Sequence, residues 1–198
     1  MWSQEAAVST QPKPFLTHEQ YLEMERQAEY KSEYWRGEMF AMAGASPDHN
    51  LLAGNLLASL HHQLRGRPCV VFPSDMRVFI PATGLYTYPD VTVVCGGRRL
   101  ADQHRDTLLN PVLVAEILSP STESWDRGRK FEHYRTVESL QQYLLVAQDR
   151  LQVDLYTRQA EGTWLLREAR RLKDTLDLES IGYRILLADL YDKVDLPA

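Results

Sequence analysis

The spacing of apolar residues predicts helices and strands that alternate along most of the chain. After Pro47 a set of leucines recurs at helical intervals until Gly66 and Pro68 end the pattern: Leu51, Leu52, Leu56, Leu57, Leu60 and Leu64. This segment is the longest predicted helix, and its apolar stripe must cover a sheet.

Short apolar runs predict the strands of that sheet. CVVF and MRVFI lie within residues 69–80, PDVTVV covers 89–94 and PVLVAEIL covers 111–118. The last run is almost continuously apolar, which indicates a central strand buried on both faces. Further on, a helix is predicted over 124–136, followed by strands at QYLLVA, LQVDLYT, TWLLREA and YRILL and by a short helix at LLADLYDKV.

The N-terminal region has its own pattern. Residues 1–14 are polar, contain two prolines and predict a flexible lead-in. Thr17 and Gln20 form a capping-box pattern for a short helix that ends before Tyr30. SEYWRGEMFAMAG then predicts a hairpin that turns at Gly37. With no repeat or long linker, we expect a single domain over 15–198.

Composition limits the functional classes. The 198 residues are 44% hydrophobic and 25% charged, as in packed globular domains, and the net charge is −5, so any contact with nucleic acid must be local. No secretory leader or run of about 18 apolar residues is present, so we expect a cytoplasmic protein with no membrane segment. Cys69 and Cys95 match no zinc pattern and are expected to be reduced core residues.

Two acidic residues on neighbouring predicted strands are the strongest chemical signal. Asp90 follows a proline at a strand start, and Glu116 interrupts the buried run 26 residues later. A buried carboxylate is costly unless it is compensated, and a divalent cation is the strongest candidate partner. Mg²⁺ or Mn²⁺ could use the two carboxylates, with the backbone carbonyl of Ile117 as a third ligand. Lys130, on the following helix, could assist an attacking water.

These segments resemble the Uma-type restriction endonuclease family, part of the PD-(D/E)xK nuclease superfamily. The resemblance runs from Thr17 to Val194 and rests on SEYWRGEMFAMAG, SPDHN, YPDVTVV, NPVLVAEILSPSTESWDRGRKFEHYR, LQQYLLV and ADLYDKV. It implies an α/β fold, with a mixed restriction-endonuclease-like sheet core flanked by helices and an N-terminal hairpin extension. It also implies an endonuclease that hydrolyses phosphodiester bonds in DNA, with Glu33, Asp90 and Glu116 converging on the metal and Lys130 beside it.

One position departs from the superfamily motif. The residue two after Glu116, where that motif has lysine, is Leu118. The resemblance therefore implies that the lysine has moved to the helix, at Lys130. His49, at the start of the long helix, is a possible accessory residue that could contact a metal-bound water or a phosphate.

Each candidate also has a structural alternative. Asp90 could cap a turn, Glu116 could pair with Arg77, and Lys130 could pair with Asp126 on a solvated helix face. Glu33 could be an ordinary strand residue and His49 an ordinary helix-start residue. A basic cluster beside the proposed site could form a local phosphate-binding patch: Arg127, Arg129, Lys130 and Arg135.

Two other functions are alternatives to DNA cleavage: a non-catalytic binding module that keeps the nuclease fold, and a hydrolase of small phosphodiesters. A homodimer is also plausible, because the hairpin near Gly37 could pair across a two-fold axis.

Overall fold

The computed structural model describes residues 15–196. The chain divides into two compact units, one up to Met42 and one from Ala43, and each is described by itself. The segment 1–14, predicted to be flexible, lies outside the described residues. A single domain over 15–198 stays a prediction.

The N-terminal unit is a short helix followed by a hairpin. α1 (His18–Gln27) begins at Thr17, and Thr17 and Gln20 form the predicted capping box. β1 (Ser32–Trp35) pairs antiparallel with β2 (Glu38–Ala41). The turn residues Arg36 and Gly37 have φ values of 50° and 83°, as a two-residue hairpin turn requires. The predicted hairpin is therefore confirmed, while its pairing in a dimer stays a prediction.

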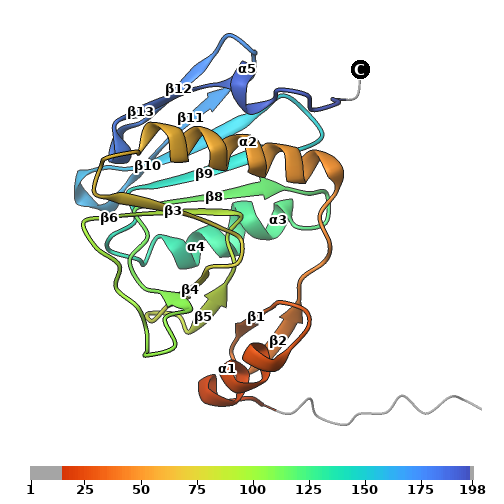
Figure 1. The fold of residues 1–198 in the computed structure, drawn as a ribbon, viewed down its shortest axis with the longest axis vertical. Helices are drawn as coiled ribbons and strands as arrows, with labels where there is room; N and C mark the ends of the chain where they lie inside the picture. Colours follow the sequence, from red (N-terminus) through yellow and green to blue (C-terminus); the bar gives the residue numbers. More distant parts are fainter. Residues whose placement is uncertain (1–14, 197–198) are drawn as a thin grey trace, which may run out of the picture. The chain divides into compact units, whose positions relative to one another are not determined.

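A six-stranded mixed sheet organises the second unit (Figure 1). β8 lies inside it, parallel to β9 and antiparallel to β6, and all six of its residues are buried. The expectation of a central strand buried on both faces is thus confirmed. In spatial order the strands are β11 (Trp164–Ala169), β10 (Val153–Arg158), β9 (Gln142–Ala147), β8 (Leu113–Leu118), β6 (Val91–Cys95) and β3 (Cys69–Pro73).

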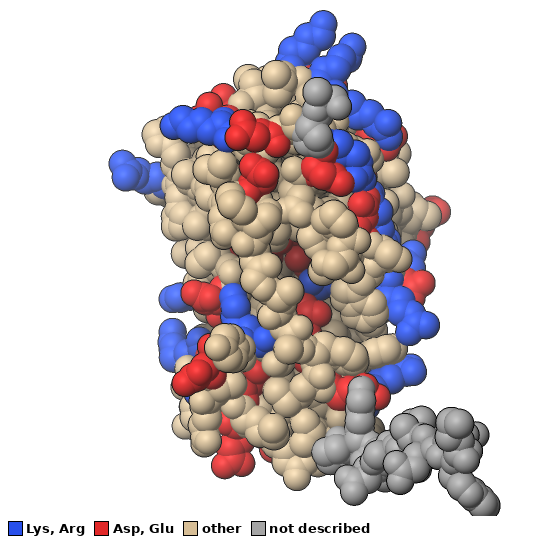
Figure 2. All heavy atoms as spheres, turned by 90° about the vertical axis from the view of Figure 1, so that its right-hand side faces the viewer, with Lys and Arg blue, Asp and Glu red and all other residues tan. Residues whose placement is uncertain are grey.

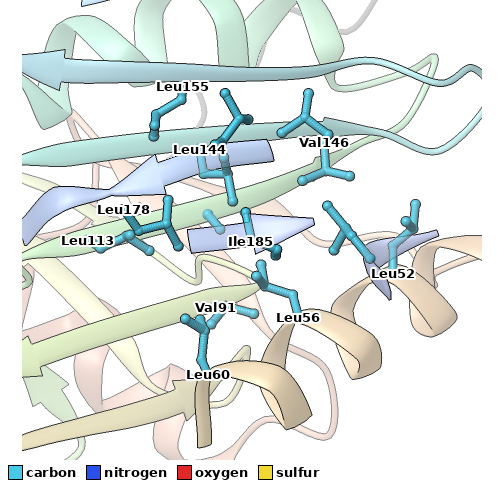
Figure 3. Packing of buried hydrophobic residues seen from close by; sticks show 14 of the residues in the cluster. Leu52, Leu56, Leu60, Val91, Leu113, Leu144, Val146, Leu155, Leu178 and Ile185 are labelled. Atoms are coloured by element: carbon cyan, nitrogen blue, oxygen red, sulfur yellow. The ribbon is translucent and has the colours of Figure 1, made fainter. Parts of the chain in front are cut away.

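The predicted long helix, α2 (Pro47–Gln63), covers one face of this sheet. Its Leu52, Leu56 and Leu60 point toward the strands and are fully buried (Figure 3). Every second residue of β8, starting at Leu113, joins the same apolar cluster. Each buried leucine contributes about 1.5–3 kcal/mol by leaving water, so this cluster fixes which side of β8 faces away from α2.

A second helical segment covers the opposite face, where 124–136 was predicted to be one helix. It consists of α3 (Glu123–Trp125), a π-helical turn η1 (Asp126–Lys130) and α4 (Phe131–Tyr134). Phe131 stacks on Tyr143 of β9 with ring centroids 5.2 Å apart, and Tyr134 packs on the same ring. Aromatic contacts therefore hold this segment against the sheet.

Several short elements complete the second unit. β4 (Arg77–Ile80) pairs with β5 (Leu85–Thr87) and β7 (Thr107–Leu108). β12 (Thr175–Leu178) and β13 (Tyr183–Leu186) form a hairpin that leads into α5 (Leu187–Leu190), with 3-10 turns η2 (Ala160–Gly162) and η3 (Glu179–Ile181) nearby. The apolar pattern did not predict β5, β7 or β12.

Between residues 15 and 196, no helix is long and apolar enough to cross a bilayer.

The two cysteines form a disulfide, so the expectation that both are reduced is wrong. Cys69 on β3 lies directly opposite Cys95 on β6, and the two sulfur atoms are bonded. Apolar flanking residues predicted the two strands, but the register that pairs these positions comes from the tertiary structure. The bond ties the edge strand β3 to its neighbour.

Removing this disulfide should destabilise the fold. The cross-link closes 26 residues, and the chain-entropy model gives about 3.5 kcal/mol for a loop of that length. We expect the double variant C69S/C95S to lose about 2–4 kcal/mol of unfolding free energy in urea titrations. Wild type measured with a reducing agent should match the variant. Equal midpoints for oxidised wild type and variant would contradict the disulfide.

Candidate active site

Glu116 occupies the one charged position of β8 and is 3% exposed. Because Ala115 and Ile117 face the α2 cluster, strand alternation turns Glu116 toward the opposite helical segment. Its Oε1 lies 3.0 Å from the Nζ of Lys130 and accepts a hydrogen bond of 2.9 Å from the Tyr134 hydroxyl. The buried carboxylate therefore has two partners supplied by the η1–α4 segment.

Lys130 is itself buried, at 5% exposure, and lies between two carboxylates. Besides Glu116 it contacts Oδ1 of Asp126 at 3.4 Å, and Asp126 is 3% exposed. The predicted Asp126–Lys130 pair is thus present. The expectation that it lies on a solvated helix face is wrong, because both side chains are buried. The two residues open and close the π-helical turn, a feature that is frequent at functional sites.

Tyr143 supports this arrangement from β9. Its hydroxyl donates to the backbone carbonyl of Asp126 at 3.0 Å, which anchors the start of the π turn. Complete burial, together with the negative charges of Glu116 and Asp126, raises the pKa of Tyr143 well above its usual value. The hydroxyl therefore stays protonated and remains a donor.

Asp90 lies just before β6, and its partners come from two directions. Its Oδ2 accepts a hydrogen bond of 2.7 Å from the backbone N–H of Ile117, in the peptide group that joins Glu116 to Ile117. The same oxygen lies 3.3 Å from Nε2 of His49. Asp90 is thus held next to the backbone of Glu116, as a shared site requires.

Strand register agrees with this placement. Val91 of β6 pairs with Ala115 of β8, and both side chains belong to the α2 cluster. One residue away in the chain from each of these lie Asp90 and Glu116, which the antiparallel register brings next to each other. The two acidic positions therefore meet at one end of the sheet.

The start of α2 places His49 beside Asp90. Ser46 caps the helix, because its hydroxyl oxygen accepts a hydrogen bond of 3.1 Å from the backbone N–H of His49. The same hydroxyl donates a hydrogen bond of 2.7 Å to Oε1 of Gln148. The Nδ1 atom of His49 is buried and has no hydrogen-bond partner among residues 15–196. The imidazole thus contacts Asp90 through one nitrogen and has a second polar atom unsatisfied.

Carboxylates gather at this site. Glu116 and Asp126 are buried and both contact the ammonium of Lys130, while Asp90 is held against the backbone N–H that follows Glu116. Carboxylate oxygens are the ligands that hard divalent cations prefer, so this chemistry suits such an ion. Within residues 15–196, no group of three or more acidic, histidine or cysteine side chains could hold a metal on its own. Any ion would need other ligands besides side chains.

The other residues named from the sequence differ in location and in hydrogen-bond partners. Glu33 is half-buried on β1 in the N-terminal unit, and its part in the site stays a prediction. Ile117 contributes its N–H to Asp90, whereas its carbonyl as a metal ligand stays a prediction. Arg77, the alternative partner of Glu116, bonds instead to Thr107, Tyr88 and Asp106.

Sequence reasoning missed two members of the cluster. Asp126 was considered only as a solvated partner of Lys130, and Tyr134 was not considered at all. The repeated interval of four in Asp126, Lys130 and Tyr134 is the signal that could have found them, because residues four apart share a helix face.

The carboxyl end of β8 and the start of α2 lie on the right-hand side of Figure 1. Figure 2 views that side and shows acidic and basic atoms recessed near its middle, among uncharged atoms. The side chains of His49 and Asp90 are 16% and 14% exposed, so solvent reaches the edge of the candidate site.

Comparisons with known proteins agree with the fold. A crystal structure from Anabaena variabilis, described as a "putative nuclease" of the DUF820 family, superposes with a TM-score of 0.72. The match covers 89% of this chain and 97% of that one at 19% identity, which establishes a shared fold. The predicted α/β class with a mixed sheet and flanking helices is therefore confirmed.

Comparisons of sequence show the family. Two uncharacterised proteins of Synechocystis sp. are similar: slr1290, 38% identical over 91% of this chain and 93% of its own, and sll1609, 40% identical over 77% and 86%. The model of the Uma2 family, described as "Putative restriction endonuclease", matches residues 18–188. The chain is a nuclease-like protein that belongs to the Uma2 family.

Proposed function

We propose that this protein hydrolyses phosphodiester bonds in DNA with the help of a divalent cation bound beside Asp90 and Glu116. The observation that carries the proposal is the gathering of carboxylates at the end of the central strands: Glu116 and Asp126 are buried against Lys130, and Asp90 is held beside the backbone of Glu116. A divalent cation held by Asp90 and Glu116 would in turn bind a substrate phosphate, whereas a purely structural ion pair needs only one carboxylate for the lysine.

The donor atoms fit Mg²⁺ or Mn²⁺. These hard ions prefer oxygen ligands and are commonly held by one or two carboxylates together with waters and a substrate phosphate. Asp90 and Glu116 would hold the ion, with the Ile117 carbonyl as a third ligand. When bound, such an ion neutralises developing charge and makes a water molecule more acidic.

The residues of the chain would divide the remaining tasks. The Tyr134 hydroxyl and Lys130 hold Oε1 of Glu116 in place, so that carboxylate does not need to reorganise. The Lys130 ammonium can donate a hydrogen bond that orients the attacking water, or it can stabilise the charge that develops on the phosphate. His49 contacts Oδ2 of Asp90 through Nε2. Its other ring nitrogen, Nδ1, could accept or donate a proton.

A non-catalytic binding module is the second candidate, and one observation favours it. The Lys130 ammonium already lies between Glu116 and Asp126, so these two carboxylates have a cationic partner without any metal. In that case the site would keep its structure and bind nucleic acid without cutting it. The experiments below separate the two functions.

Glu116→Gln should abolish cleavage of plasmid DNA. The amide keeps the size of the side chain but loses the charge that binds the cation, so we expect a rate loss of about 100-fold or more and no heat of Mg²⁺ binding in calorimetry. Glu132→Gln, on the exposed side of α4, is the matched control and should behave like wild type.

Other outcomes identify the alternatives. If E116Q cuts DNA at the wild-type rate, the proposed mechanism is wrong. A wild-type protein that binds DNA but shows neither cleavage nor Mg²⁺ heat would be a binding module. Cleavage of a chromogenic diester with intact DNA would identify a hydrolase of small phosphodiesters.

Asp126→Asn should impair catalysis by releasing Lys130. Asp126 acts as a positioning residue, and a small displacement of a catalytic group can cost about 100-fold in rate. We expect kcat to fall with KM unchanged, because the ammonium loses the carboxylate that positions it. Steady-state kinetics would measure both constants. A variant with reduced stability but an unchanged kcat would show that Asp126 is only structural.

A further inference from the structure

A second basic region lies at the far end of α2 from His49. A hollow of about 590 Å³ opens there between the end of α2, the edge strand β3 and the loop after β6. Five basic or imidazole side chains line it: His61, His62, Arg65, Arg67 and Arg98. Its lining contains no carboxylate, although acidic residues outnumber Lys and Arg by 27 to 22 in the chain.

Local structure explains part of this concentration of charge. His61 and His62 lie in the last turn of α2, where the helix dipole favours cations. Arg67 has a structural role, because its guanidinium donates to the carbonyl of Ile181 at 2.7 Å. These three residues would need no ligand.

Arg65 and Arg98 are not explained in this way. Both side chains are exposed, and among residues 15–196 neither has an ion-pair partner. They come from separate elements, the end of α2 and the loop after β6, and yet line one hollow. The disulfide between Cys69 and Cys95 joins the two strands beside it and keeps their spacing fixed. The hollow therefore brings two exposed guanidinium groups to one side of a cross-linked pair of strands.

Three of the four residues in the basic cluster predicted on the 124–136 helix already contact other groups of the protein. Lys130 is buried against Glu116, and Arg127 is paired with both Glu123 and Asp154. The guanidinium of Arg135 lies over the ring of Phe131, 5.3 Å from its centroid. A phosphate backbone would therefore find more uncommitted positive charge in the hollow than on that helix.

The hollow and the candidate active site are linked by one helix. α2 begins beside Asp90 and ends at the hollow, and its 17 residues correspond to about 25 Å at 1.5 Å per residue. In B-DNA about 3.4 Å of axis separates successive phosphates of one strand, so this length matches roughly seven base pairs.

We propose that the hollow binds backbone phosphates of duplex DNA about seven base pairs from the phosphate held at the Asp90–Glu116 site. The proposal rests on the proposed nuclease function and adds the position of a second DNA contact. Arg65 and Arg98 supply the charge, without reading base sequence. This contact fixes how DNA lies along α2 and offsets the repulsion expected from a protein of net charge −5.

The test compares two double variants with equal charge. R65S/R98S and the control R170S/R171S each remove two exposed arginines and so change the net charge from −5 to −7. Binding of a labelled duplex is measured by fluorescence anisotropy over a range of salt, with Ca²⁺ in place of Mg²⁺ to prevent cleavage. Each lost phosphate contact lowers the slope of log affinity against log salt by about 0.9. We expect R65S/R98S to lower the slope by about 1.8 and the control to leave it unchanged.

The alternatives give distinct results. Equal slopes for R65S/R98S and wild type would overturn the hollow as a DNA contact, as would an equal loss in both double variants, which would show only a net-charge effect. Displacement of the duplex by inorganic phosphate at low concentration would indicate a site for the free ion and also overturn it. Failure of the nuclease function is seen separately, as cleavage by E116Q, and leaves the salt slopes interpretable. A wild-type protein that binds no duplex would overturn both proposals.

Discussion

The ion pair between Lys130 and Glu116 is the constraint on which the candidate site depends. Both side chains are almost fully buried, so each charge must be compensated where it lies. Replacing Lys130 would leave buried carboxylates without this ammonium, a loss that typically costs about 3–5 kcal/mol. The sheet and the η1–α4 segment must therefore pack in a single arrangement, the one that brings these two atoms together.

The apolar core makes that constraint possible. Leucines of α2 occupy one side of the central strands and leave the other side to Glu116 and to aromatic residues around Tyr143. A one-residue slip of β8 would bring the carboxylate into the leucine cluster, where no cation is available. Packing on one face of the sheet thus fixes the chemistry on the other face.

Much of this could be predicted from the sequence, because its signals were local. The leucine spacing of α2, the capping box at Thr17 and the buried run around Glu116 each depend on residues close together in the chain. The disulfide depends on cross-strand register, and β7 has only two residues, so periodicity contains no information on either. The sequence identified Asp90 and Lys130 as candidate site residues. The roles of Tyr134 and Asp126 depend on burial, and the many polar residues of that helix suggest exposure to solvent instead.

The π-helical turn makes the site sensitive to chain length. Successive residues of any helix rotate around its axis, so the loss of one residue between Asp126 and Lys130 would turn one of them away from the sheet. Substitutions between these two residues, such as at the exposed Gly128, leave the geometry intact as long as the number of residues is kept. Among relatives we therefore expect the positions between Asp126 and Lys130 to vary in sequence but to tolerate neither insertions nor deletions.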